Sequence, residues 1–197
     1  MSEDVTAGCC GGGRFPSVTM SATMKFVTLN AKSCNLTHKR KKIALELTHI
    51  YNKIDILFLQ ETHLEEVNET KTAYFSHGTS AARGVAILLN GGDDLELMKI
   101  NQEEYLKDDN GRIIAIGIIC KGKKIGLINC YAPNLNDSKK VQEEYLAYLD
   151  DLSKILAELD NACDILIVGG DFNIALDKKL DAKGGKCRIY DVCVWRE

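Results

Sequence analysis

Short apolar segments alternate with polar ones along the chain, and their spacing predicts the secondary structure. Runs rich in β-branched residues predict strands at 25–30, 54–59, 84–89, 95–100, 112–119, 124–131 and 165–168. Apolar residues that recur every three or four positions predict helices over 39–52 and 138–160. Asn110-Gly111 predicts a hairpin turn. This order of elements is typical of an α/β protein in which packed sheets carry helices on their outer faces.

The two ends of the chain lack this periodicity. Residues 1–23 are rich in Gly, Ser, Thr and Ala, which predicts a disordered leader. Residues 177–197 are polar and aperiodic, which predicts an irregular tail. The ordered domain is therefore expected to span residues 24–176.

Composition narrows the class of protein. The chain has 197 residues, of which 45% are hydrophobic, as in a globular domain. It has no secretory signal and no apolar stretch long enough for a membrane span, so we expect a nuclear or cytoplasmic protein without membrane contact. The net charge of −3 argues against a protein that coats nucleic acid non-specifically.

Four polar motifs follow apolar strands and carry the candidate chemistry. They are Asn30, Glu61, the Tyr131-Ala132-Pro133-Asn134 segment, and Asp171-Phe172-Asn173. In layered α/β folds, side chains at strand ends share a crevice. Carboxylates such as Glu61 and Asp171 suit Mg²⁺, which prefers oxygen ligands and commonly takes one or two carboxylates. Asparagine amides orient water or phosphate, and a tyrosine hydroxyl donates to phosphate or assists a leaving oxygen.

Taken together, these motifs resemble the endonuclease/exonuclease/phosphatase superfamily. Leu29-Asn30, Leu59-Gln60-Glu61-Thr62, Asn129 to Asn134 and Gly170-Asp171-Phe172-Asn173 match its first four motifs in order. The resemblance implies a DNase I-like, four-layer α/β sandwich made of two packed mixed β-sheets with outer helices. It also implies that the C-terminal part of this fold is missing here.

The resemblance implies a role for each motif residue. Glu61 and Asn30 would bind Mg²⁺, with Mn²⁺ as a substitute. Tyr131, Asp171 and Asn173 would be catalytic: Asp171 activates or orients the attacking water, Asn173 positions water and phosphate, and Tyr131 contacts the phosphate or supports the leaving group. Asn134 would contact phosphate. The expected reaction is hydrolysis of a DNA phosphodiester that leaves a 3′-hydroxyl.

The branch of the superfamily is indicated by the third motif. Tyr-x-Pro-Asn is similar to the motif of apurinic/apyrimidinic endonucleases and exonuclease III. Gln60 to Leu64 and Arg83 to Leu89 look most like endonuclease domains of non-LTR retrotransposons. A cellular repair enzyme, either an apurinic/apyrimidinic endonuclease or a 3′–5′ exonuclease, is the alternative. Double-stranded DNA is the expected partner, and no obligate protein partner can be inferred.

Two departures from the superfamily pattern bear on activity. Lys32 stands where many relatives have an aspartate. The closing Ser-Asp-His-type motif has no match, since no histidine follows His77. Losing one donor that stabilises transition-state charge costs roughly 10²–10³ in rate. We therefore expect low activity, and an inactive retroelement remnant or a DNA-binding fragment is the alternative of another class.

A basic run opens the first predicted helix. Lys39, Arg40, Lys41 and Lys42 follow His38 directly. Positive charge at a helix N-terminus opposes the helix dipole, so helix stability does not explain the run. We expect Lys39 to Lys42, together with Lys32, to contact DNA phosphates; a solvated charge run and a nuclear-localisation signal are the alternatives.

Overall fold

The fold was analysed in a computed structural model, which describes residues 24–34, 36–42, 54–64, 72–79, 81–90, 95–134, 138–173 and 193–195. The predicted leader at 1–23 lies outside these residues. So do most of the helix predicted over 39–52 and all of the predicted tail except 193–195.

The first sheet has the strand order β1-β2-β4-β3. Its strands are β1 (Phe26–Asn30), β2 (Ile56–Gln60), β3 (Ala73–Ser76) and β4 (Val85–Leu89). β1 and β2 are parallel, whereas β4 is antiparallel to both β2 and β3, so the sheet is mixed. β2 is buried along its whole length, which explains its unbroken run of apolar residues.

The second sheet has the order β10-β9-β8-β7-β5, with β6 also paired to β7. Its strands are β5 (Glu96–Met98), β6 (Leu106–Lys107), β7 (Ile113–Cys120), β8 (Lys123–Tyr131), β9 (Ile165–Asp171) and β10 (Cys193–Trp195). β8 and β9 are parallel and the other pairs are antiparallel. The connection between β8 and β9 is α2 (Lys139–Ala162).

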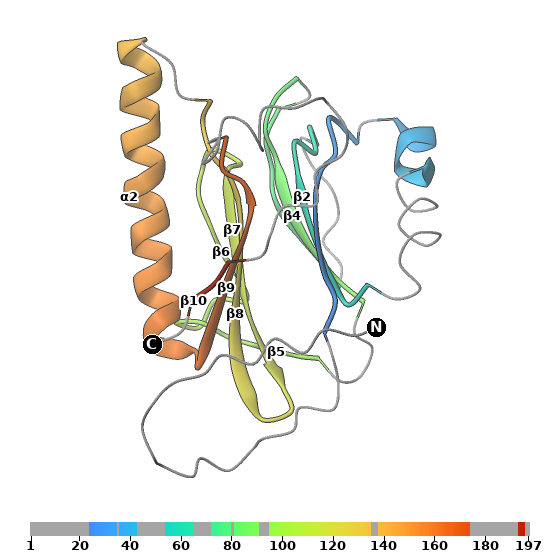
Figure 1. The fold of residues 1–197 in the computed structure, drawn as a ribbon, viewed down its shortest axis with the longest axis vertical. Coiled ribbons are helices and arrows are strands. Elements are labelled where there is room, and N and C mark those ends of the chain that lie inside the picture. The colour runs from blue at the N-terminus through green and yellow to red at the C-terminus, as the bar shows by residue number, and fades with distance from the viewer. Residues whose placement is uncertain are drawn as a thin grey trace, which may run out of the picture.

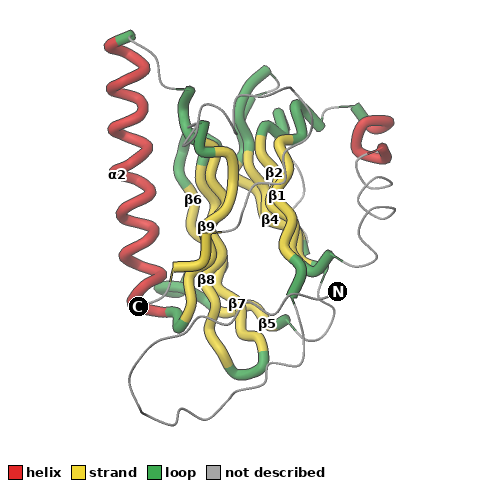
Figure 2. The backbone as a smooth tube through the Cα atoms, viewed as in Figure 1, coloured by secondary structure: helices red, strands yellow, loops and turns green. Residues whose placement is uncertain are grey.

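The two sheets pack face to face, and α2 covers the outer face of the second sheet (Figure 1). A helical segment at 37–42 lies on the opposite side, beside the first sheet (Figure 2). β7 shows why this layering follows from sequence: Ile114 and Ile116 pack between the sheets, whereas Ile113 and Ala115 pack under α2. The predicted fold class, two packed mixed sheets with outer helices, is confirmed.

Some local expectations differ from the structure. The strand predicted over 165–168 continues to Asp171, because Gly169 and Gly170 remain paired with β8. The Asn110-Gly111 turn leads from β6 into β7, since β6 pairs with β7 ahead of that turn. β3, β6 and β10 were not predicted, and β10 occupies part of the segment expected to be irregular. Short strands carry too few residues for a visible alternation.

Candidate active site

The sequence motifs meet at one end of the two sheets. β1 and β2 run parallel with Asn30 opposite Gln60, and β8 and β9 run parallel with Tyr131 opposite Asp171. Parallel strands in register bring their carboxyl ends to one edge of the sheet. Residues 30, 61, 131 and 171 are therefore neighbours although they are far apart in sequence.

Asn30 links the two carboxylates. Its Nδ2 donates to Glu61 Oε1 at 2.7 Å and to Asp171 Oδ2 at 3.0 Å. Its Oδ1 accepts from the backbone N–H of Lys32 at 3.0 Å, which fixes the orientation of the amide. One neutral group thereby holds two negative groups together, one from each sheet.

Tyr131 adds a second donor to Glu61. The phenol oxygen lies 3.0 Å from Glu61 Oε1, and the bond crosses from one sheet to the other. Burial, followed by the hydrogen bond to Glu61, raises the pKa of Tyr131 to about 12. The hydroxyl is therefore protonated at neutral pH and acts as a hydrogen-bond donor.

Asp171 and Asn173 form a tight turn. The backbone N–H of Asn173 donates to Asp171 Oδ1 at 3.1 Å, and Asn173 Nδ2 donates to the carbonyl of Ala132 at 2.6 Å. Asp171 Oδ1 thus faces its own turn while Oδ2 faces Asn30. The Asp-x-Asn spacing suits this arrangement, because an aspartate accepts from the backbone two residues later.

Several residues at this edge have left-handed backbone conformations. Glu61, His63 and Asn173 have φ values of 51°, 53° and 51°. Such conformations cost about 1–3 kcal/mol each and concentrate at functional sites. The surrounding backbone holds them: the N–H of Ser33 donates to the Glu61 carbonyl at 2.7 Å, and the N–H of His63 donates to the Arg83 carbonyl at 2.9 Å.

His63 lies in the segment from Gln60 to Leu64, and no role was predicted for it. Its Nε2 lies 3.8 Å from Glu61 Oε2, on the oxygen that neither Asn30 nor Tyr131 contacts. The side chain is 18% exposed, so it forms part of the wall of the site.

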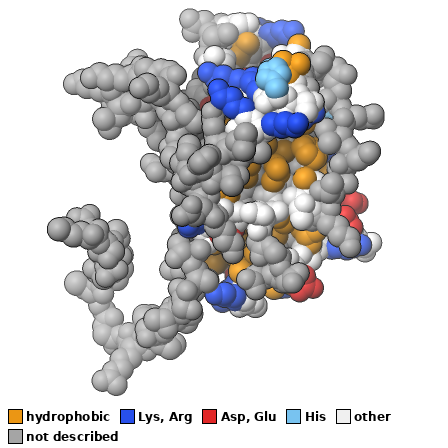
Figure 3. Space-filling view, turned by 90° about the vertical axis from the view of Figure 1, so that its right-hand side faces the viewer, with side chains coloured by type: hydrophobic (Ala, Val, Ile, Leu, Met, Phe, Trp, Pro, Cys, Tyr) orange, Lys and Arg blue, Asp and Glu red, His pale blue; other side chains and the backbone are white. Residues whose placement is uncertain are grey.

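The predicted DNA-contacting residues lie beside the carboxylates or remain exposed. Lys32 is exposed and lies two residues after the end of β1, and Lys39 Nζ donates to the Lys32 carbonyl. Arg40 Nη1 donates to the Cys34 carbonyl at 2.5 Å, so part of its guanidinium holds the loop after β1. Figure 3 views the side that carries the 37–42 helix and shows Lys and Arg side chains gathered around a histidine near one end.

The remaining members of this set are at the surface. Lys41, Lys42 and Asn134 are exposed, and Asn134 follows the buried Pro133. This placement leaves all three side chains accessible to a ligand, and their contacts with DNA stay a prediction.

Two buried networks around the site were not predicted. Asn129, fully buried, donates to the carbonyls of Leu59 and Ala86 at 2.8 and 2.7 Å and accepts from Gln60 Nε2 at 2.7 Å. Arg112 lies against the Tyr131 ring and pairs with Glu144 of α2. Asn129 and Gln60 belong to the sequence motifs described above. Their hydrogen-bond partners could not be predicted, because these depend on how the two sheets pack against each other.

The carboxylates of the site fit Mg²⁺. Glu61 and Asp171 present two carboxylates at one amide, an arrangement that a hard dication would stabilise. With these two carboxylates as its protein ligands, a bound Mg²⁺ would keep several waters. Asn30 turns its nitrogen, not its oxygen, toward the carboxylates, and the metal-binding role predicted for it stays a prediction.

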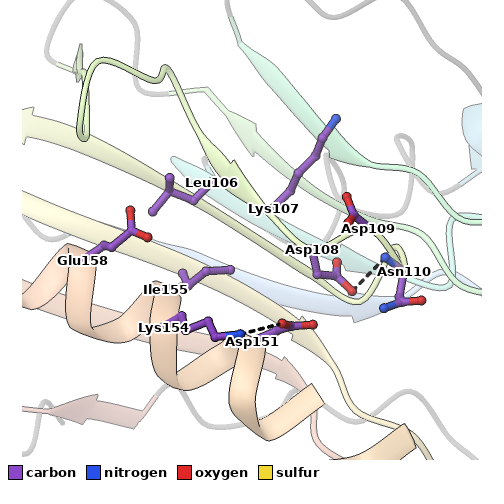
Figure 4. Close-up of a pocket in the computed structure, with 9 residues that line it drawn as sticks. All are labelled: Leu106, Lys107, Asp108, Asp109, Asn110, Asp151, Lys154, Ile155 and Glu158. Atoms are coloured by element: carbon purple, nitrogen blue, oxygen red, sulfur yellow. Dashed lines mark hydrogen bonds and ion pairs between the residues drawn. The ribbon is translucent and has the colours of Figure 1, made fainter. Parts of the chain in front are cut away.

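A separate pocket of about 260 Å³ lies between α2 and the turn before β7 (Figure 4). It is lined by residues 106–110 and by Asp151, Lys154, Ile155 and Glu158. Within it, Lys154 Nζ lies 3.8 Å from Asp151 Oδ1. None of the predicted site residues lines it, so the candidate chemistry belongs to the strand-end site.

Comparison with known proteins agrees with this geometry. An apurinic/apyrimidinic endonuclease from Archaeoglobus fulgidus matches with 27% identity and a TM-score of 0.54, covering 79% of this chain and 59% of that one. A 3′–5′ exonuclease from Neisseria meningitidis matches with 25% identity and a TM-score of 0.54, covering 77% and 59%. The APE2 catalytic domain of Xenopus laevis has the same fold at 19% identity, with a TM-score of 0.57 over 79% and 60%. No family model matches the sequence.

The chain therefore has the fold of the apurinic/apyrimidinic endonucleases and exonuclease III-like proteins, and the predicted resemblance to them is confirmed. Its sequence is also 26% identical over 189 residues to an uncharacterised 149 kDa protein of transposon TX1 from Xenopus laevis, covering 86% of this chain and 13% of that protein. That likeness agrees with the predicted resemblance to endonuclease domains of retrotransposons. The chain spans about three fifths of the length of the solved relatives it matches.

In the described part of the chain, no helix has both the length and the apolar character needed to cross a membrane.

Proposed function

We propose that this chain is a Mg²⁺-dependent DNA endonuclease that nicks duplex DNA and leaves a 3′-hydroxyl. The observation that carries the proposal is the convergence of Asn30, Glu61, Tyr131 and Asp171 in one hydrogen-bonded cluster. Two carboxylates, a neutral amide and a protonated phenol are groups that suit phosphodiester hydrolysis.

Each residue would contribute the chemistry that its side chain suits. Glu61 would hold Mg²⁺, which when bound supplies positive charge to a phosphate oxygen. Asp171 Oδ2 would accept a proton from the attacking water, with its carboxylate kept in place by Asn30 and the N–H of Asn173. Tyr131, protonated at neutral pH, would donate to the phosphate or to the leaving oxygen. Lys32 and residues 39–42 would contact the DNA backbone.

The retrotransposon type is favoured by the transposon relative, which the chain matches over 86% of its length. In that setting the 3′-hydroxyl would prime synthesis of a new strand. The likeness to an apurinic/apyrimidinic endonuclease at 27% identity favours the second candidate, incision at abasic sites. The two candidates share chemistry and differ in the DNA feature that is recognised.

Nicking of supercoiled plasmid in Mg²⁺ tests the proposal. The protein, its Glu61→Gln variant and a matched control, Glu96→Gln, would be compared with and without EDTA. Glu96 is an exposed carboxylate on β5. We expect nicking by the wild type and the control, a loss of roughly 10²-fold or more in Glu61→Gln, and none with EDTA. Extension of the nicked strand by a polymerase would identify the 3′-hydroxyl.

A duplex oligonucleotide with one abasic analogue separates the two candidates. Preferential incision at the analogue would favour an abasic-site endonuclease. Equal cutting of intact duplex would favour an endonuclease of the retrotransposon type. Absence of nicking from protein with a cooperative unfolding transition would overturn the proposal and support the inactive remnant.

A further inference from the structure

Arg112 is bound to Tyr131 in three ways. Its guanidinium lies over the Tyr131 ring, 5.4 Å from the ring centroid, and its Nη1 donates to the Tyr131 carbonyl at 3.2 Å. Its own carbonyl accepts from the Tyr131 N–H at 2.7 Å. Arg112 therefore contacts the Tyr131 backbone at both its N–H and its carbonyl, and it also covers one face of the ring.

Glu144 of α2 holds Arg112 in this place. Glu144 Oε1 accepts from Arg112 Nη2 at 2.6 Å and from Arg83 Nη2 at 2.7 Å. The Arg112 side chain is only 10% exposed, so its charge is largely removed from water and depends on this carboxylate. The hydrogen bond from Arg112 lowers the pKa of Glu144, which keeps the carboxylate ionised.

The cluster is more elaborate than a structural ion pair requires. Arg112 is unusually buried for a charged side chain, whereas Glu144 and Arg83 are 32% and 34% exposed, and ion pairs near the surface contribute little to stability. The contacts form a chain from Glu144 of α2 to Arg112 and from Arg112 to Tyr131. The Tyr131 hydroxyl in turn donates to Glu61 at 3.0 Å. Without Arg112, the Tyr131 ring would lose the contact on one face, and the Tyr131 carbonyl would lose a donor.

We infer that Arg112, held by Glu144, is a positioning residue that fixes the Tyr131 hydroxyl on Glu61. Its part in catalysis rests on the proposed function, whereas its effect on the orientation of Tyr131 does not. Small displacements of a reacting group of about 1 Å reduce rates by as much as roughly 10²-fold. Loss of Arg112 is therefore expected to lower kcat and to leave KM for DNA nearly unchanged, because Arg112 is buried away from solvent.

The orientation is tested without DNA. Protein labelled with ¹³C at the tyrosine ζ carbon would be compared as wild type, Arg112→Met, Arg112→Lys and Lys154→Met, with Tyr131→Phe used to assign the Tyr131 signal. Lys154→Met is the matched control, since it removes an ion pair with Asp150 on the exposed face of α2. We expect the Tyr131 signal to shift in Arg112→Met, to return toward the wild-type value in Arg112→Lys, and to stay in place in Lys154→Met.

A double-mutant cycle tests the catalytic consequence. Arg112→Met is expected to lower kcat by about 10- to 100-fold in the wild-type background and by less than about twofold in the Tyr131→Phe background. Equal losses in both backgrounds, or an unshifted Tyr131 signal in folded Arg112→Met, would overturn the inference. If wild-type protein does not nick DNA, the proposed function fails, while the labelled-tyrosine experiment still decides whether Arg112 orients Tyr131.

Discussion

Gln60 donates to Asn129 Oδ1 at 2.7 Å, and this fully buried bond joins the two sheets directly behind the candidate site. Gln60 precedes Glu61, and Asn129 precedes Tyr131 by two residues. Asn129 also donates to carbonyls of β2 and β4, so its amide bonds three groups of the first sheet. The separation between Glu61 and Tyr131 is therefore set by a polar connection inside an otherwise apolar interface.

Replacing Asn129 with leucine is expected to destabilise the fold strongly. The variant leaves the Leu59 and Ala86 carbonyls and one Gln60 N–H without their partner, and each buried unsatisfied group costs about 1–3 kcal/mol. We expect a loss of roughly 3 kcal/mol or more in the free energy of unfolding, measured by urea denaturation. Asn161→Leu is the control, because Asn161 donates to the Ala157 carbonyl on an exposed turn of α2. A similar cost at both positions would contradict the role given to burial.

Gly170→Ala is expected to displace Asp171. Gly170 has φ of 140°, and a Cβ at this position would overlap the backbone of Cys130 on the neighbouring strand. β8 and β9 would have to separate where Tyr131 faces Asp171. We expect a loss of about 3 kcal/mol in thermal or urea unfolding, together with a loss of nicking.

Gly122→Ala provides the matched comparison for Gly170. Gly122 also has positive φ, 74°, but a Cβ there meets nothing within 4 Å. Only the backbone preference is violated, at a cost of about 1–2 kcal/mol, and the site lies at the other end of β8. A variant Gly122→Ala as damaging to nicking as Gly170→Ala would show that strand separation is not the cause.

Asn30→Asp is expected to make the fold dependent on a divalent cation. The substitution replaces the donor between Glu61 and Asp171 with a third carboxylate, so like charges meet without a bridging N–H. We expect a Tm several degrees below that of the wild type in EDTA, and a larger rise in Tm on adding Mg²⁺ than the wild type shows. Equal Mg²⁺ responses of the two proteins would argue against a cation between these carboxylates.

The acid stability of the fold is expected to depend on Glu144. Its hydrogen bond from Arg112 lowers its pKa below the usual value of 4.5, so the folded state binds this proton less readily than the unfolded state. The resulting stabilisation is complete above about pH 4.5 and is lost as the pH falls through the lowered pKa. Urea midpoints measured from pH 6 to pH 3 should fall less steeply in Glu144→Gln than in the wild type.

Glu143→Gln is the control for the pH experiment. Glu143 is the preceding residue of α2, and its carboxylate lies 3.9 Å from the exposed Lys139. Its pH profile should parallel that of the wild type. If Glu144→Gln and Glu143→Gln give the same profile, the ion pairs of Glu144 do not contribute to acid stability.

Sequence patterns predicted the parts of this protein that depend on local order. The apolar runs gave most strands and the long helix, and the strand-end positions of Asn30, Glu61 and Asp171 were enough to predict that they meet. The pairing of Arg112 with Glu144 could not be predicted, because it depends on the placement of α2 over the start of β7. The donor role of Asn30 likewise depends on which way its amide turns, which the Lys32 backbone decides.

The bond from Asn30 to Asp171 closes a loop of 141 residues. Contacts of such long sequence separation form late in folding, since the entropy of bringing the ends together must be overcome first. During synthesis, β1 with Asn30 would leave the ribosome long before Asp171 of β9 or Glu144 of α2 has been made. The cluster of Asn30, Glu61, Tyr131 and Asp171 can therefore assemble only after residue 171 has emerged.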